Sequence, residues 1–328
     1  MAHAAMQRQR RLLGFAVIAG LGLASAAAPA GAQPAPFSED PTLYRSNKPY
    51  PSEVEREERQ RQEEAGVRPY SPLSVLGGAD FRGQYFYRGY NYVSSGLAFQ
   101  PYLVAGYTVH KDPNFSVTPH AGVWADITEQ QNVNQDPERQ TLSHFNELRG
   151  YFGVAVETHK FVFDVQYVYY TSPSETFEDS QELGVDVRYD DRSCWRNQPL
   201  LSGLNPTLSI YRELQDDRDD DLNTFIGVGL EPALKPFEAG RIPITVSFPV
   251  TVGGSYDGYY QNSDGQNASF GYWEAGVRAA VPLGRSAFGM NWSVDAEVDY
   301  IRLMAFSVRE ANGFDPDDVV FRIGIAFR

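Results

Sequence analysis

The sequence predicts an all-β protein, a transmembrane up-and-down antiparallel β-barrel of about twelve strands. Apolar and polar residues alternate with a period of two from about residue 76 to the end, as expected of strands with one apolar and one polar face. After the N-terminal region, no stretch approaches the roughly 18 consecutive apolar residues that a spanning helix needs. Short and long connections tend to alternate along the chain, which is typical of membrane barrels.

The composition agrees with a strand-rich protein and excludes some partners. The 328 residues include 20 Tyr and 20 Phe, and aromatic residues favour pleated surfaces. A mean hydropathy of −0.40 is too polar for a helical membrane protein. The formal net charge of −14 argues against a nucleic-acid partner, because binding to phosphates requires clustered Lys and Arg.

The N-terminus has the features of a secretory signal peptide. Three arginines within residues 8–11 precede an apolar run at residues 12–28, and the small triplet 30–32 follows. We therefore expect a signal peptide over residues 1–32, cleaved near Ala32, and export to the outer membrane of a Gram-negative-type bacterium. A retained N-terminal anchor is the alternative.

A charged segment follows the signal peptide. Residues 33–75 are rich in Pro, Glu, Arg and Gln, and Ser52 and Glu55 can form a capping box for one short helix that ends near Gly66. This helix has no apolar face to bury, so we expect a solvated periplasmic arm. A partner-binding segment or a barrel plug is the alternative. The predicted organisation is a signal peptide at 1–32, the arm at 33–75 and the barrel at 76–328.

The clearest strand is 291–300, in which Trp292, Val294, Ala296, Val298 and Tyr300 share one face and acidic or polar residues share the other. Similar segments recur about a dozen times. We predict strands near 76–88, 97–109, 114–126, 145–157, 160–171, 179–189, 204–214, 222–231, 242–253, 269–281, 287–301 and 317–328.

Strand length and aromatic spacing favour a barrel in lipid over a soluble sandwich. The segments are longer than typical globular strands and match the length needed to cross a bilayer at a tilt. Trp292 and Tyr300 are eight residues apart, or roughly 20 Å along the membrane normal, which approximates the spacing of two aromatic girdles. Outer-membrane lipid and lipopolysaccharide are therefore expected partners. The girdle candidates are Tyr167, Tyr169, Trp292, Tyr300 and Phe327.

Six short motifs carry a family resemblance: Phe86-Tyr87-Arg88-Gly89, Gly96-Leu97-Ala98-Phe99-Gln100, Ala121-Gly122-Val123-Trp124, Glu147-Leu148-Arg149-Gly150-Tyr151, Tyr169-Tyr170-Thr171-Ser172-Pro173 and Gln181-Glu182-Leu183. In this order they resemble segments of the TorF family of porin-like outer-membrane proteins, whose function is largely unknown. The resemblance covers about residues 80–190. This chain departs from the family pattern in its long charged arm and in ending on Arg328. The resemblance implies a barrel and a channel, and supplies no catalytic residues.

The polar face of each strand predicts which charged side chains face the barrel lumen, since charges at membrane depth are costly on the lipid face. Ten acids face six bases, so an open pore would weakly prefer cations. The other interpretation is that these groups pair and brace the barrel, and the two roles are compatible. The candidates are Asp80, Asp126, Glu147, Asp164, Glu182, Asp186, Glu274, Asp295, Glu297 and Asp299, with Arg82, Arg88, Arg149, Arg188, Arg278 and Arg322.

We expect a passive, porin-like channel for small polar solutes, with no cofactor and no metal site. Cys194 is the single cysteine, which excludes a cysteine zinc cluster. The acidic run 216–221 lacks the ligand spacing of a calcium loop. The first alternative is a closed structural barrel whose loops or arm bind a partner. The second is a lipid hydrolase with His144 as the base, but no nucleophile motif supports catalysis. The sequence does not indicate an oligomeric state.

Overall fold

The computed structural model describes residues 72–112, 114–129, 144–174, 177, 179–216, 222–239, 242–285 and 290–328. The predicted signal peptide, the arm up to residue 71 and residues 217–221 of the acidic run lie outside these ranges. Within the described ranges, no helix is long and apolar enough to cross a membrane.

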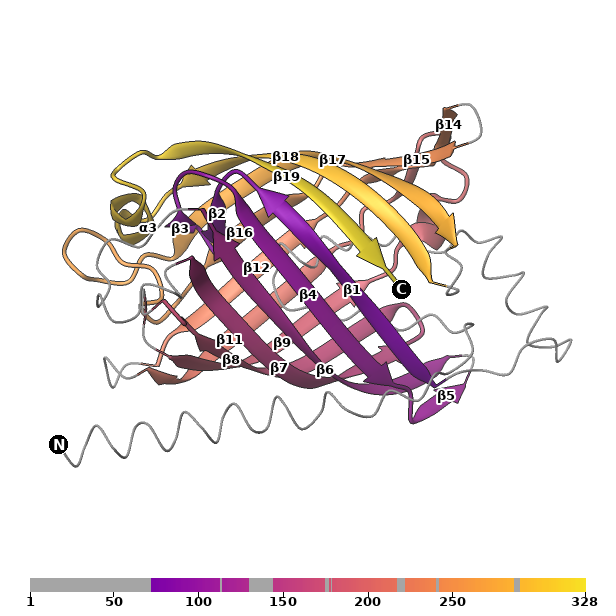
Figure 1. Cartoon of the computed structure of the whole chain (residues 1–328), viewed down its shortest axis with the longest axis horizontal. Coiled ribbons are helices and arrows are strands. Elements are labelled where there is room, and N and C mark those ends of the chain that lie inside the picture. The colour runs from indigo at the N-terminus through magenta and orange to yellow at the C-terminus, as the bar shows by residue number, and fades with distance from the viewer. Residues whose placement is uncertain are drawn as a thin grey trace, which may run out of the picture.

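The described residues form a closed barrel of twelve antiparallel strands, which confirms the predicted fold class (Figure 1). Each strand pairs with its neighbours along the chain, and the last strand pairs with the first, in the register Asp80↔Gly324. The barrel strands are β1 Leu73–Arg82, β4 Ala98–Tyr107, β6 Phe115–Thr128, β7 Phe145–Thr158, β8 Phe161–Thr171, β9 Ser180–Tyr189, β11 Thr207–Asp216, β12 Thr224–Leu230, β16 Val250–Gly254, β17 Phe270–Arg285, β18 Asn291–Leu303 and β19 Asp317–Phe327.

Two predicted strands differ from the observed ones by more than a shift of a few residues at their ends. The segment predicted at 76–88 begins earlier and ends at Arg82, and the chain then forms a separate hairpin of β2, Tyr85–Tyr87, and β3, Tyr90–Val93. The segment predicted at 242–253 is divided into β15, Ile242–Ser247, and β16. Pro249 lies at this break, because proline cannot donate a hydrogen bond to the sheet.

The two ends of the barrel differ (Figure 1). At the terminal end, where β1 begins and β19 ends, the connection at 190–203 is long, as its length in the sequence indicates. It contains the 3-10 helix η2, Arg192–Trp195, and β10, Leu201–Gly203. The other elements at this end are β5 His110–Asp112, β13 Ala233–Leu234, β14 Phe237–Ala239 and β15. At the opposite end, which we call the hairpin end, lie the β2–β3 hairpin and α3, Phe306–Ala311.

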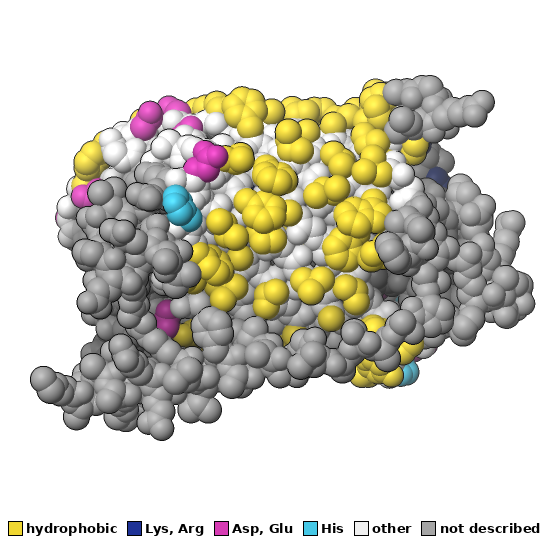
Figure 2. Space-filling view, viewed as in Figure 1, with side chains coloured by type: hydrophobic (Ala, Val, Ile, Leu, Met, Phe, Trp, Pro, Cys, Tyr) yellow, Lys and Arg dark blue, Asp and Glu magenta, His cyan; other side chains and the backbone are white. Residues whose placement is uncertain are grey.

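The outward face of the barrel is apolar. Figure 2 shows hydrophobic side chains gathered over the middle of the visible wall. Adjacent residues on β18 have opposite environments, since Val298 is 43% exposed and Glu297 is 3% exposed. A soluble protein would bury the first and expose the second. Other large apolar side chains exposed on this face are Leu103, Phe152, Phe163, Val165, Leu183, Ile210, Val228, Val277, Phe321 and Ile323.

Candidate functional site in the barrel interior

The sixteen charged residues predicted to face the lumen are all buried, and none is more than 6% exposed. Fifteen of them lie on barrel strands, because alternate side chains of each strand point inward. Arg88 is the exception, since it lies in the turn between β2 and β3. Eleven of the sixteen belong to three groups.

The first group, which we call the seam cluster, lies where β19 meets β1. Arg322 donates from Nη1 to Oδ1 of Asp80 at 3.0 Å, and from Nη2 to Oε2 of Glu297 at 2.7 Å. It also contacts Asp295, whose carboxylate lies 3.5 Å from Nε of Arg278. One guanidinium of β19 therefore joins three carboxylates from its two neighbouring strands, Asp80 of β1 and Asp295 and Glu297 of β18.

The second group, the Arg88 cluster, consists of Arg88, Glu182, Tyr87 and Tyr170. Arg88 donates to both carboxylate oxygens of Glu182, at 2.6 and 2.9 Å. The Tyr170 hydroxyl donates to the same carboxylate at 2.7 Å and lies 2.8 Å from the Tyr87 hydroxyl. Such a two-pronged pair fixes both the distance and the orientation of the guanidinium.

Arg149 extends the second group along the wall. Its guanidinium donates to Glu147 of the same strand and to the hydroxyl of Tyr85 in β2. It also lies 4.1 Å from the ring centroid of Tyr87 and 4.4 Å from that of Trp124. The hairpin is thus attached to β7 as well as to β9.

The third group contains Asp164 and Asp186, which are opposite each other on β8 and β9. Asp164 contacts Nε2 of His120 at 2.8 Å. Asp186 accepts hydrogen bonds from the hydroxyls of Ser209 and Tyr211, each at 2.5 Å. These neutral donors satisfy the carboxylate without an arginine.

The remaining candidates lie on β1, β6, β9, β17 and β18. Asp126 accepts from the side-chain amides of Gln100 at 2.9 Å and Asn146 at 3.0 Å. Nη2 of Arg82 lies 3.9 Å from Oδ2 of Asp80, and both residues belong to β1. Arg188, Glu274 and Asp299 are buried on β9, β17 and β18.

The position of the β2–β3 hairpin was not predicted from the sequence. Residues 83–97, which we call the inner hairpin, leave the wall after β1 and return to it at β4. Its tip is Arg88-Gly89, with φ of +50° and +83°, the left-handed pair of a two-residue hairpin turn. Glycine adopts this conformation without strain. The signal in the sequence is this dipeptide between Tyr87 and Tyr90, inside a segment that otherwise alternates like a wall strand.

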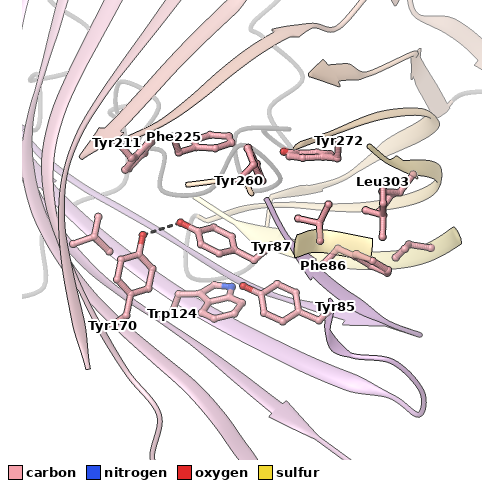
Figure 3. Packing of buried hydrophobic residues seen from close by; sticks show 14 of the residues in the cluster. Tyr85, Phe86, Tyr87, Trp124, Tyr170, Tyr211, Phe225, Tyr260, Tyr272 and Leu303 are labelled. Atoms are coloured by element: carbon pink, nitrogen blue, oxygen red, sulfur yellow. Dashed lines mark hydrogen bonds between the residues drawn. The ribbon is translucent and has the colours of Figure 1, made fainter. Parts of the chain in front are cut away.

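Aromatic rings enclose the tip of the inner hairpin. The Arg88 guanidinium carbon lies 4.4 Å from the ring centroids of both Tyr211 and Phe225. The Tyr260 hydroxyl donates to the Arg88 carbonyl at 2.9 Å, and burial raises the pKa of this phenol above its ordinary value. Figure 3 shows these rings around the hairpin, with the hydrogen bond between Tyr87 and Tyr170.

Contacts near the barrel mouth attach the other side of the inner hairpin. The Tyr90 hydroxyl lies 2.9 Å from the Tyr259 carbonyl and 3.2 Å from the Ser307 hydroxyl. Asn91 donates to Oδ1 of Asn312 at 2.6 Å. The inner hairpin therefore contacts the loops before β17 and β19.

The predicted girdle residues lie on or next to the outer face of the wall. At the terminal end, the rings of Trp292 and Phe327 are 5.1 Å apart. Towards the hairpin end, the ring centroids of Tyr300 and Trp273 are 5.4 Å apart. Trp273 is not among the predicted girdle residues. Tyr167 and Tyr169 donate their hydroxyls to Gln181 and Asp179, each at 2.7 Å.

No family model matches the chain, and no curated protein sequence matches it. Several solved structures are similar to it. The β-domain of the Bordetella autotransporter Brka has 8% identity and a TM-score of 0.41, covering 79% of this chain and 99% of that one. The NanC porin has 12% identity and a TM-score of 0.38, covering 78% and 100%. An outer membrane channel from Pseudomonas putida F1 has 8% identity and a TM-score of 0.39, covering 79% and 96%. Because these TM-scores are below 0.5, the similarities do not establish the fold. The barrel is assigned from the pairing of its own strands.

Proposed function

We propose that the protein is an outer-membrane, porin-like passive channel for small polar solutes. The observation that carries this proposal is the inverted polarity of the wall, with ionic side chains inside and a band of exposed apolar side chains outside. This arrangement suits a barrel surrounded by acyl chains, with a polar path through it. The terminal end would then face the periplasm and the hairpin end the cell exterior.

The ionic side chains of the interior support a weak cation preference. The ten acids and six bases leave an excess of four negative charges, which would attract cations in a narrow, low-dielectric path. The ion pairs of the seam cluster also brace the wall, because they connect β1, β18 and β19. Bracing and selectivity are therefore compatible roles for the same residues.

A closed structural barrel is the second candidate, and the low exposure of the interior favours it. All sixteen ionic residues are at most 6% exposed, whereas an open aqueous pore would leave several of them in contact with water. In this second role, the outer loops or the N-terminal arm would bind a partner.

Planar-bilayer recording of the purified protein tests the choice. Discrete conductance steps with a reversal potential that indicates cation preference support the channel. Silence, with insertion verified by protease protection or heat-modifiable migration, supports the closed barrel. The solute class follows from liposome swelling with neutral, anionic and cationic solutes of similar size.

The remaining expectations fit this proposal. The motifs that resemble the TorF family support a porin-like barrel, and the predicted signal peptide supports export. Lipid and lipopolysaccharide would surround the apolar band.

Lipid hydrolysis is the third alternative. His144 lies at the hairpin end, 2.9 Å from the Thr128 carbonyl through Nδ1. Unchanged lipid hydrolysis after His144→Ala would exclude it as a catalytic base.

A further inference from the structure

We propose that the inner hairpin, residues 83–97, is a removable plug held by the pairing of Arg88 with Glu182, and that its withdrawal opens the pore and strengthens its cation preference. This inference rests on the proposed channel function and specifies how that channel is closed. Four observations carry it: the independence of the barrel from the hairpin, the form of the connections, the nature of the contacts, and the charge that withdrawal uncovers.

The barrel wall closes without the inner hairpin. β1 and β4 pair directly, from Leu73↔Tyr107 to Arg82↔Ala98. β2 and β3 pair with each other in a separate two-stranded sheet and contribute no rung to the wall. At its two ends, the inner hairpin makes backbone hydrogen bonds to the wall, from Gly83 N to the Phe321 carbonyl at 3.3 Å and from Glu129 N to the Leu97 carbonyl at 3.0 Å. Displacing the part between these two points, residues 84–96, would break no hydrogen bond between β1 and β4, and the barrel ladder is the main source of backbone stability in a membrane.

The connections to the hairpin allow it to move as a unit. Ser94, Ser95, Gly96 and Leu97 are exposed on the returning side. On the outgoing side, a Cβ added at Gly83 would have no atom within 4 Å. Both connections are exposed, so rotations between their wall-bonded ends, Gly83 and Leu97, are sufficient to move the tip.

The hydrogen bonds that hold the tip each involve at least one side chain, and the shortest belongs to a buried ion pair. Arg88 is 2% exposed and Glu182 is 5% exposed. Burying both charges removes their hydration, which offsets much of their attraction. In the described part of the chain, Nε of Arg88 has no hydrogen-bond partner, so this group also loses hydration without replacement. Withdrawal of the hairpin would return both residues to water. The free-energy difference between the closed and open states of the pore is therefore smaller than the number of contacts suggests.

Withdrawal would also change the charge of the pore. Arg88 is the one lumen base carried by the hairpin rather than by the wall. Moving it out leaves ten acids and five bases in the pore, and it uncovers Glu182 with its neighbour Tyr170. Glu182 is therefore the specificity residue of the open state, attracting cations at the place that the plug had occupied.

The first experiment removes the plug from the full-length protein. Deleting residues 84–94 leaves Gly83, Ser95, Gly96 and Leu97 as a four-residue loop between the paired residues Arg82 and Ala98, a length that hairpins tolerate. We expect a conductance step at least about threefold larger than that of the wild type, with a reversal potential shifted further towards cation selectivity.

A matched pair of substitutions separates release of the plug from loss of charge. Glu182→Gln and Asp126→Asn each remove one lumen carboxylate, but Asp126 is bound by the wall residues Gln100 and Asn146. We expect Glu182→Gln to increase the open fraction, which is the fraction of recording time that the channel spends open, at least about threefold. Asp126→Asn should leave the open fraction unchanged.

A crosslink tests the plug without deleting it. In a Cys194→Ser background, Asn91→Cys and Asn312→Cys place two thiols where side chains now share a hydrogen bond. A short bifunctional thiol reagent should abolish openings, and each single cysteine variant treated in the same way should conduct normally. This test remains valid if the deletion variant fails to insert.

The outcomes distinguish the plug from the channel. Equal step size and selectivity in the wild type and the deletion variant, or unaltered conductance after crosslinking, would overturn the plug while leaving the channel intact. Silence of both proteins at verified insertion would overturn the channel and, with it, the plug.

Discussion

Arg322 and Asp80 connect the last strand of the barrel to the first, with Nη1 of Arg322 donating to Oδ1 of Asp80 at 3.0 Å although the residues are 242 positions apart. Arg322 also bonds Glu297 and Asp295 of β18. The guanidinium therefore spans the seam at which the sheet closes on itself. Its loss would leave three buried carboxylates without their shared cation.

We predict that Arg322→Met lowers the free energy of unfolding by about 3 to 5 kcal/mol, because uncompensated buried charges are costly. Urea unfolding of the protein reconstituted in vesicles, followed by heat-modifiable migration, measures the change. Arg322→Lys is the control, since it keeps the charge but not the forked geometry, and should have a smaller effect. An unchanged unfolding midpoint for Arg322→Met would show that the seam does not depend on this cluster.

A ring of β11 lies over a glycine of β9. Gly184 and Tyr211 are opposite each other, and a Cβ at Gly184 would lie 2.6 Å from Cδ1 of the Tyr211 ring. We predict that Gly184→Ala destabilises the barrel by about 1 to 3 kcal/mol through overpacking. The Tyr211 ring contacts Arg88, so displacing this ring should also weaken the hold on the proposed plug and increase channel opening.

Gly83→Ala is the matched control for this substitution, because the space around Gly83 is open. We expect its unfolding free energy to remain within about 0.5 kcal/mol of the wild type. Urea titration and bilayer recording of both variants give the comparison. Equal stability of the two variants would refute the packing argument.

The exposed apolar band predicts a cost for charge at its centre. Phe152, in the middle of β7, is 60% exposed on the outer face. Phe152→Arg should reduce the free energy of folding into bilayers by about 2 to 4 kcal/mol, the cost of arginine near the midplane. Phe115→Arg, at the first position of β6, should cost about 0 to 1 kcal/mol. Equal costs would contradict the assigned membrane position.

Tryptophan fluorescence separates the outer face from the interior. Trp273 is 36% exposed on the wall, whereas Trp124 is 1% exposed beside Tyr85. In variants that keep a single tryptophan, lipids with brominated acyl chains should quench Trp273 and Trp292 strongly and Trp124 weakly. Strong quenching of Trp124 would show that this ring faces lipid.

The strand pattern could be predicted because it is local. Twelve predicted segments correspond to the twelve strands of the wall, since alternation within ten residues determines which side chains share a face. The division of 242–253 around Pro249 was missed because a proline can be accommodated at a bulge or can end pairing. The neighbours along the chain do not distinguish these outcomes.

The inner hairpin could not be predicted in the same way. Tyr85 and Tyr87 alternate with the polar residues Gln84 and Arg88 as wall residues do, so the pattern predicts that this segment continues the first strand. Its position depends on Glu182 and Tyr260, which lie 94 and 172 residues from Arg88. Only closure of the barrel brings these groups together.

The sequence by itself determined that the chain is a strand-built membrane barrel and which side chains lie on the polar face of each strand, because both properties follow from a period of two and the cost of charge in lipid. The tertiary structure alone decided which acid pairs with which base, and that one hairpin lies inside the wall. Those choices depend on strand register and closure, which place distant residues within hydrogen-bonding distance of each other.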